Sequence, residues 1–370
     1  MEFTIKKSDL VRELGLCQGV SEKKTTIPVL SNVLLEAEDG EVSLTVTDLE
    51  LGIRCRCAAT VKKPGSTTIP SRKLLDYVRL LPDAELSVKV GENHAALLLC
   101  GRSKTRIVGM SRENYPELPS MPAAVTQIPA KMLGAVIAKT IFAIASEESR
   151  YTLTGAQLIL QPDSLIMVST DGHRLAYIRA EHAFDGVNGQ LKALLPRKAM
   201  AELQRVTAES GESDEVSFAT DENHLFFRFD KRVLITRKLT GQFPDYERVL
   251  PQQKGRTVML NKDEATAAIR RVSQFADDRS HAVRVTMTDH ELKLVSSGSD
   301  AGDSEETMAV EYEGPALKAG FNSLYLLDFL GVAETENVEL EFKDDESAGQ
   351  MFLPDLQGYN YRYVVMPMKI

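Results

Sequence analysis

The chain carries a threefold internal repeat along its 370 residues. The segments LTVTDLELGIRC (44–55) and IMVSTDGHRLAYIR (166–179) share a strand, a Thr-Asp step and a second strand, and the two Thr-Asp steps lie 123 positions apart. A weaker third copy with a longer loop, LKLVSSGSDAGDSEETMAVEY, places Ser296 126 positions after Thr170. Self-similarity at a fixed period indicates a repeated structural unit, so we expect tandem domains of one fold.

Helix patterns recur with a similar period. The runs SRKLLDYVRLLP (71–82) and PRKAMAELQRVTA (196–208) both place apolar residues on one helical face and a plus, minus, plus triplet on the other. The triplets are Arg72, Asp76 and Arg79, and Lys198, Glu202 and Arg205. In the last third, NSLYLLDFLGVA keeps only the acid, Asp328. Each third also opens with a helix-like run, at 8–21, 129–146 and 261–276, and the last begins with a capping-box pattern, Asn261 and Glu264.

Aromatic-proline turns close the first two thirds, NYPELP (114–119) and QFPDYERVLP (242–251), and such turns suit linkers. We therefore predict an α+β fold of three tandem domains, at 1–121, 127–251 and 254–370, each with two helices and about six to eight strands. A tandem of similar domains favours a curved or ring-shaped assembly, because a repeated interface turns through the same angle each time.

The composition is that of an ordinary globular protein, with a formal net charge of -9 and a pI near 5.4. Simple attraction of a basic surface to nucleic acid is therefore not expected, and DNA binding requires positive charge gathered in one place. The start, MEFTIKKSDL, lacks the apolar core of a secretory signal, and no stretch approaches the ~18 apolar residues of a membrane span. We expect a cytoplasmic protein without membrane contact.

The four cysteines, Cys17, Cys55, Cys57 and Cys100, all lie in the first third. Cys55 and Cys57 alternate with arginines in a strand-like run, so both sulfurs share one face. Zinc sites space paired ligands around turn residues, which this run lacks. We expect buried strand cysteines and no metal or cofactor site.

Charge is sorted by element type. The six expected helices, counted over 8–21, 71–82, 130–146, 196–208, 262–276 and 322–333, together carry +5, which leaves -14 for the rest of the chain. Amphipathic helices ordinarily carry charged residues on their outer face, which would explain the charge of any single helix. The recurrence of the charged triplet at one period weakens this explanation for the helices as a set. If the helices share one side of the sheets, that side can contact phosphates without reading base sequence.

Three motifs complete a recognisable pattern: STDGHRLA (169–176), FPDYERVLP (243–251) and the terminal YVVMPM (363–368). Together with the repeat, they resemble the β sliding clamps of bacterial DNA polymerase III over the whole chain. The resemblance implies a head-to-tail homodimeric ring that encircles duplex DNA and slides without sequence specificity, with helices lining the hole and antiparallel sheets outside. It implies a non-catalytic subunit of a DNA-directed DNA polymerase, a nucleotidyltransferase, whose partners include the clamp loader, the replicative polymerase and other clamp-binding proteins.

The family binds a short partner peptide, often with a glutamine and two large apolar side chains, between its second and third domains. The resemblance assigns this pocket to Leu153, Thr170, Gly172, His173, Arg174, Leu175, Pro244, Arg248, Val249, Val364, Val365, Met366, Pro367 and Met368. The apolar terminus is thereby interpreted as pocket wall. Methionines suit a site shared by many partners, and micromolar binding, about -8 kcal/mol, lets partners exchange.

Two further surfaces are implied by the resemblance. DNA contacts are assigned to Lys24, Arg72, Lys73, Arg79, Tyr151, Arg197, Lys198 and Arg205, and Thr152 stands where relatives often carry a second tyrosine. The dimer seam is assigned to Arg102, Thr105 and Ile107, which would face Gln274 and Phe275 of the other subunit. Relatives usually carry an aliphatic residue in place of Gln274, so the apolar part of the seam is expected to be weaker.

Two other classes of function remain open at this point. The first is an enzyme, such as a hydrolase that uses the carboxylates of the Thr-Asp loops. It predicts a metal or substrate site in one of these loops, but none of the repeated loops contains more acidic residues than an ordinary solvated turn. His173 beside Asp171 and Ser169 lacks a glycine elbow or a second acid, so we interpret it as a packed or peptide-contacting residue. A non-ring DNA-binding or protein-interaction scaffold is the alternative; a scaffold with no DNA role predicts no sorting of charge.

Overall fold

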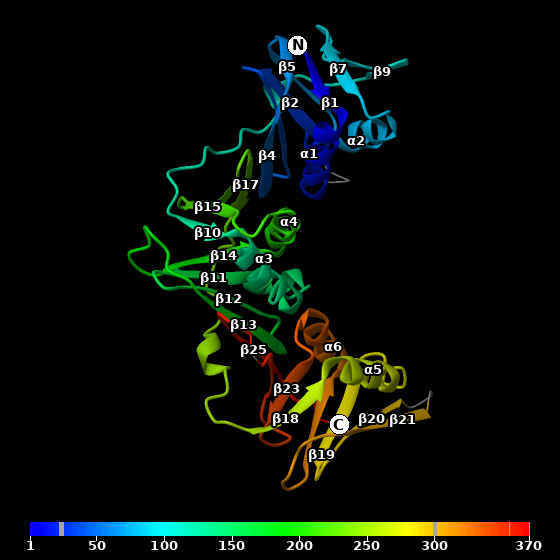
Figure 1. Cartoon of the computed structure of the whole chain (residues 1–370), viewed down its shortest axis with the longest axis vertical. Coiled ribbons are helices and arrows are strands. Elements are labelled where there is room, and N and C mark those ends of the chain that lie inside the picture. The colour runs from blue at the N-terminus through cyan, green and yellow to red at the C-terminus, as the bar shows by residue number, and fades with distance from the viewer. Residues whose placement is uncertain (22–25, 299–301, 355, 370) are drawn as a thin grey trace. The chain divides into compact units, whose positions relative to one another are not determined.

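The computed structural model describes residues 1–21, 26–298, 302–354 and 356–369 (Figure 1). The chain forms two compact units, Met1–Gly134 with Lys198–Lys238, and Ala135–Arg197 with Leu239–Ile370. Six α-helices occur in the described residues: α1 (Lys7–Val20), α2 (Ser71–Leu80), α3 (Ala130–Ala138), α4 (Arg197–Ala208), α5 (Lys262–Ser273) and α6 (Ser323–Val332). None of the helices in these ranges is long and apolar enough to cross a membrane.

The first unit contains two antiparallel sheets. One has the order β5 (Thr60–Lys63), β1 (Glu2–Lys6), β7 (Glu85–Val90), β8 (Ala96–Cys100), β9 (Ser103–Ile107). The other has the order β10 (Thr126–Pro129), β15 (Glu215–Thr220), β16 (His224–Phe229), β17 (Arg232–Arg237), β4 (Leu51–Ala58), β3 (Glu41–Thr47), β2 (Asn32–Glu38), β6 (Gly65–Pro70). Helix α1 packs against α2 and against β3 and β4.

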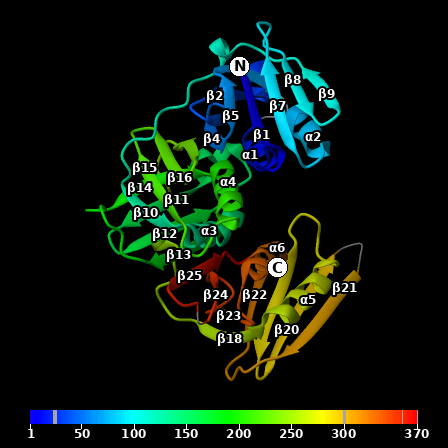
Figure 2. The same cartoon turned by 45° about the horizontal axis from the view of Figure 1, so that its top comes forward.

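The second unit repeats this plan. Its larger sheet has the order β14 (Leu191–Pro196), β11 (Gly155–Gln161), β12 (Ser164–Thr170), β13 (Arg174–Glu181), β25 (Tyr359–Val365), β24 (Gly349–Phe352), β23 (Asn337–Phe342), β18 (Arg256–Asn261). Its smaller sheet has the order β21 (Gly302–Ala309), β20 (Glu291–Gly298), β19 (Ala282–Thr288), β22 (Leu317–Asn322). Helices α5 and α6 pack together beside this smaller sheet (Figure 2).

Each of the two larger sheets spans a predicted domain boundary. Strand β4 pairs with β17, and β13 pairs with β25, so each ladder joins segments that the repeat assigns to different domains. Each sheet therefore contains strands from two repeats, because pairing across the ladder satisfies edge-strand N–H and C=O groups that would otherwise be exposed.

A local sequence signal explains the start of α5 but not the end of α3. Asn261 caps α5, its Oδ1 accepting hydrogen bonds from the Asp263 and Glu264 backbone N–H groups, both at 3.1 Å. The helix expected at 129–146 is shorter in the structure, where α3 ends at Ala138. Thr140 leaves the helical region with φ -129°, and its hydroxyl donates to the Val136 carbonyl at 2.7 Å. This side-chain bond competes with the backbone ladder.

One helical face differs from the prediction. Glu202 of α4 was expected on the outer face, yet it is buried, while Arg205 stays exposed. Arg205 Nη1 donates to Glu202 Oε2 at 2.8 Å, and a Cβ placed on Gly19 of α1 would lie 1.9 Å from Glu202 Oε1. The close packing of α1 against α4 buries this carboxylate. The spacing of residues within α4 alone does not indicate that packing.

All four cysteines are buried free thiols, as expected, although Cys17 lies on α1 and not on a strand. Burial raises the pKa of the Cys57 thiol to about 12. Within the described ranges, no three or more His, Cys, Asp or Glu side chains are arranged to hold a metal ion. The thiols therefore behave as small core residues.

Candidate functional site

An apolar cavity of about 110 Å³ opens in the second unit where β13, β25 and the segment after β17 meet. Its lining comes from four separate parts of the sequence: Leu153, Thr170, Gly172, Arg174, Leu175, Pro244, Tyr246, Val249, Val364 and Met366. A cluster of buried apolar residues lies beneath it, including Ile166, Val168, Phe243 and Leu250. The cavity can hold an apolar side chain in a preformed, largely dry setting.

The Thr-Asp loop owes its shape to side-chain hydrogen bonds. Thr170 Oγ1 donates to the Arg174 carbonyl at 2.6 Å and accepts from the Gly172 N–H at 3.1 Å. Asp171 Oδ1 accepts from the His173 and Arg174 N–H groups at 2.9 and 3.0 Å. Gly172 sits at φ +89°, where glycine avoids the cost of a Cβ. Asp171 is therefore a turn-forming residue with its oxygens engaged, which disfavours a role in hydrolysis.

Arg174 ties this loop to α6 and to the 3-10 turn Ile141–Ala143 that follows α3. Its guanidinium donates to Asp171 Oδ2 at 3.0 Å, to Asp328 Oδ2 at 2.5 Å and to the Phe142 carbonyl at 2.7 Å. It also stacks 4.4 Å from the centre of the Tyr325 ring. Burial alone would lower the pKa of Arg174, but its contacts with Tyr363 and Asp328 raise it above its ordinary value. The loop is thus held by a fixed positive charge.

The C-terminal segment forms one wall of the cavity because its backbone is anchored on both sides. Strand β25 pairs with β13 so that Val364 lies opposite Leu175. Beyond the strand, the Met366 N–H donates to the His173 carbonyl at 2.9 Å, and the Met368 N–H donates to the Gly320 carbonyl at 2.8 Å. Val364 is buried, whereas the Met366 side chain stays 37% exposed at the cavity mouth.

The structure places nine of the fourteen predicted pocket residues along this cavity. Four others lie outside its lining: Arg248, paired with Asp245 at 2.8 Å and 86% exposed, and Val365, Pro367 and Met368. The fifth, His173, lines a neighbouring polar cavity of about 410 Å³ with Arg150 and Tyr325. Tyr246 was missed by the sequence, although it lies within the motif FPDYERVLP; its ring packs 5.9 Å from that of Tyr177.

The predicted DNA contacts differ in how far they are already paired. In the first unit, Lys198 Nζ donates to Asp48 and Arg205 Nη2 donates to the Gly15 carbonyl. The pairing of Arg72 is looser, with its Nε 3.9 Å from Asp76 Oδ2. The remaining described members of the set are exposed: Lys73, Arg79, Tyr151 and Arg197. Lys24 lies outside the described residues. Exposed cations on α2 and α4 can contact phosphates without base readout.

The predicted seam residues lie at or near two sheet edges. Strand β9 is the edge of its sheet and exposes Lys104 and Arg106, with Arg102 also exposed just before it. Ile107 is only 3% exposed and is buried within its own unit. Strand β21 is the edge of its own sheet and exposes Asp303 and Glu305. Gln274 is exposed and Phe275 half-buried at the end of α5.

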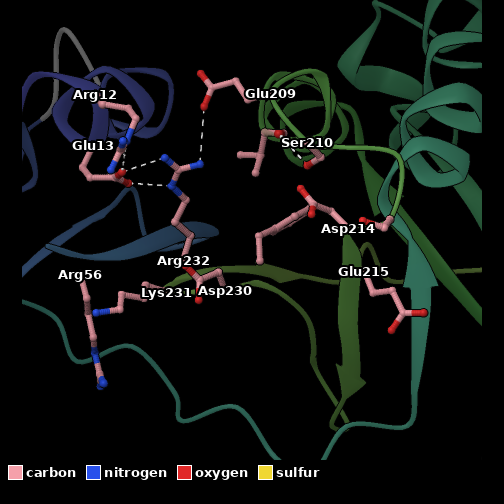
Figure 3. A pocket seen from close by; sticks show the side chains of 13 residues that line it. Arg12, Glu13, Arg56, Glu209, Ser210, Asp214, Glu215, Asp230, Lys231 and Arg232 are labelled. Carbon is pink, nitrogen blue, oxygen red and sulfur yellow. Dashed lines mark hydrogen bonds and ion pairs between the residues drawn. The ribbon is translucent and has the colours of Figure 1, made fainter. Parts of the chain in front are cut away.

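A larger cavity, of about 710 Å³, lies in the first unit and contains a charged cluster (Figure 3). Glu13, with its side chain 3% exposed, accepts hydrogen bonds from Arg12 Nε at 2.8 Å and from Arg232 Nε and Nη2, both at 2.7 Å. Burial alone would raise the pKa of Glu13, but the hydrogen bonds from Arg232 and Arg12 lower it below its ordinary value. An ionised carboxylate held by two guanidinium groups is a structural ion pair and a poor proton donor.

Comparison with known proteins covers the whole chain. Three models of the DNA polymerase III beta subunit match, the N-terminal domain at 1–119, the central domain at 127–245 and the C-terminal domain at 247–369. The beta sliding clamp of Pseudomonas putida is 34% identical over 373 residues and that of Chlamydia pneumoniae 31% identical over 372, each alignment covering at least 99% of both chains.

Solved structures agree with these relatives. The DNA polymerase III subunit beta from Pseudomonas aeruginosa superposes with a TM-score of 0.94 at 33% identity and full coverage of both chains. The DNA polymerase sliding clamp from Bacillus subtilis gives a TM-score of 0.93 at 25% identity, covering 100% of this chain and 99% of that one. The chain therefore belongs to the DNA polymerase III beta subunit family, the beta sliding clamps, with three tandem α+β clamp domains and a non-catalytic role in polymerase processivity.

Proposed function

We propose that two copies of this chain form a ring around duplex DNA and tether replication proteins through the apolar cavity beside the β13–β25 strand pair. The observation that carries the proposal is the construction of that cavity, in which the C-terminal segment, the Thr-Asp loop and the segment after β17 converge on one small apolar site. A site of this size suits one or two apolar side chains of a linear peptide, with Met366 adapting to different ligands.

The predicted residue roles follow from this proposal. The fourteen predicted pocket residues remain the candidate contact set, with the nine that line the cavity at its centre and Tyr246 as an addition. The predicted cations and Tyr151 contact the DNA backbone, giving salt-dependent and sequence-independent association. The domains span 1–121, 127–251 and 254–370, and the chain acts in the cytoplasm as a subunit of a nucleotidyltransferase holoenzyme.

The dimer seam is supported by the charges at the two sheet edges. Pairing β9 of one subunit with β21 of the other would place Lys104 and Arg106 opposite a strand that exposes Asp303 and Glu305. Opposite charges on facing strands favour this pairing over that of like edges. Arg102, Thr105, Gln274 and Phe275 lie beside this contact, and Ile107 would support it from beneath.

Retention on DNA tests the ring. The protein is placed on nicked circular DNA by a clamp loader, and the bound fraction is measured before and after the circle is cut. We expect release only after linearisation, because topological linkage holds the ring and affinity does not. Equal retention on circular and linear DNA would contradict the ring and favour a DNA-binding scaffold.

A further inference from the structure

The strand pair β4–β17 of the first unit has the same backbone design as the pair β13–β25 that frames the apolar cavity. Thr47 Oγ1 donates to the Leu51 carbonyl at 3.0 Å, and Asp48 Oδ1 accepts from the Glu50 and Leu51 N–H groups at 2.9 and 2.7 Å. The Arg237 N–H donates to the Glu50 carbonyl at 2.7 Å, just as Met366 donates to His173. The two turns therefore share the same hydrogen-bond pattern, each joined to the neighbouring strand by one corresponding backbone bond.

The substitution that matters for packing in the first site is Gly52, which stands where the second site has Leu175. The register places Gly52 opposite Ile235, where the second site has Leu175 opposite Val364. The space left by the absent side chain is occupied by Leu118, because a Cβ added to Gly52 would lie 2.6 Å from Leu118 Cδ2 and 2.8 Å from Cδ1. Leu118 also packs with Met121 against a buried cluster of Ala219, Phe226 and Ile235.

The segment that carries Leu118 lies across this site like a bound linear peptide. It has no strand or helix between Tyr115 and Val125. Its start is anchored by the Tyr115 hydroxyl, which donates to the Thr45 carbonyl at 2.9 Å, and its end by the Val125 N–H, which donates to the Phe218 carbonyl at 2.7 Å. Between these anchors, Pro116 and Pro119 restrict the backbone and Glu117 faces solvent, so little entropy is lost on docking.

We propose that β4–β17 carries a second peptide site, built like the one beside β13–β25, and that the chain's own residues 115–121 occupy it as an intramolecular ligand with Leu118 as the apolar anchor. The inference rests on the proposed peptide-binding function of the first cavity. Covalent attachment gives the intramolecular ligand a high effective concentration, so free peptides of micromolar affinity do not displace it. Each chain therefore has one open peptide site, beside β13–β25, and one site beside β4–β17 that its own residues 115–121 close.

Binding stoichiometry tests the proposal. A labelled peptide with a glutamine and two large apolar side chains is titrated by calorimetry into the full chain, the variant Leu118→Ala, and both proteins lacking residues 366–370. We expect one peptide per wild-type chain, two per Leu118→Ala chain and, after truncation, none for the wild type but one for Leu118→Ala. The matched control is Met121→Ala, which contacts the same cluster but leaves Leu118 on Gly52 and should still bind one peptide.

The outcomes separate the two proposals. A folded Leu118→Ala chain that binds one peptide, and none after truncation, overturns the intramolecular-ligand inference and leaves the proposed function intact. A wild-type chain that binds no peptide contradicts the proposed function alone. In that case hydrogen exchange decides, because Leu118→Ala should speed exchange of the Leu118–Met121 amides at least ~10-fold if docking protects them. Unchanged exchange would also overturn the inference.

Discussion

The ladders β4–β17 and β13–β25 share the hydrogen-bond pattern of their turns and pair corresponding residues, but the apolar cavity described above lies beside the second ladder, whereas Leu118 packs on Gly52 of the first. The difference lies in a few side chains. Leu51 stands in the place of Arg174, Leu49 at φ +81° in the place of Gly172, and Gly52 in the place of Leu175. A shared backbone thus supports an internal contact in one unit and a candidate ligand site in the other, depending on which side chain fills the groove.

The largest expected effect comes from removing the charge that distinguishes the second ladder. Arg174→Ala should lower the free energy of unfolding of the second unit by about 3 kcal/mol or more, because Asp171, Asp328 and the Phe142 carbonyl lose a shared buried donor. Urea denaturation measures this loss. The exposed pair Arg248–Asp245 is the control, and Arg248→Ala should change stability by less than about 0.5 kcal/mol. Equal effects would show that burial of Arg174 is irrelevant to the ladder.

The next effect concerns the open site itself. Deleting residues 366–370 should weaken partner-peptide binding at least ~10-fold, about 1.4 kcal/mol, and abolish polymerase stimulation, because Met366 lines the cavity mouth. Dimerisation should persist, as analytical ultracentrifugation would show. An exposed methionine away from the cavity, in Met259→Ala, provides the control and should leave peptide binding unchanged. Undiminished stimulation by the truncated chain would remove the pocket assignment.

A smaller effect tests the closed site. Gly52→Ala should destabilise the first unit by about 1–2 kcal/mol, because the new methyl group overlaps Leu118. Thermal unfolding measures the change. Gly15→Ala in α1 is the opposite control, since no heavy atom lies within 4 Å of the added Cβ and alanine should stabilise the helix by about 0.5–1 kcal/mol. A neutral Gly52→Ala would mean that Leu118 moves aside freely.

The smallest effect is a pH dependence of the first unit. The folded pKa of Glu13 lies below its unfolded value, so its ion pairs contribute stability that is fully present above the unfolded pKa, about 4.3, and is lost as the pH falls through the folded pKa. We expect the free energy of unfolding, measured by urea denaturation, to fall over this acidic range. Glu13→Gln cannot titrate, so its stability should start lower and show a shallower slope. Parallel slopes for both proteins would contradict the role of Glu13.

Much of the architecture followed from pattern alone. The threefold repeat, the capped start of α5 and the apolar faces of α2 and α4 were predicted from spacing, because each depends on residues close together in the chain. The end of α3 and the burial of Glu202 were mispredicted, since a Thr140 side-chain bond and the approach of Gly19 decided them.

The candidate pocket shows the same division. Its Thr-Asp loop and apolar tail are visible in the sequence as motifs, and nine of the fourteen predicted pocket residues line the cavity. Tyr246 was missed and His173 lies in the adjoining cavity, because the direction of a side chain depends on the strands and loops packed around it.

The sequence by itself determined the repeat, the turn chemistry of Asp48 and Asp171, and the family, because these depend on local residue order. Only the tertiary structure decided which grooves stay open. Residues far apart in the chain meet there: Leu118 packs against Gly52 in one unit, while Leu153, Leu175 and Val364 leave a cavity in the other. Packing of this kind depends on differences in side-chain shape as small as one methyl group. The order of residues along the chain does not record such differences between residues far apart in the sequence.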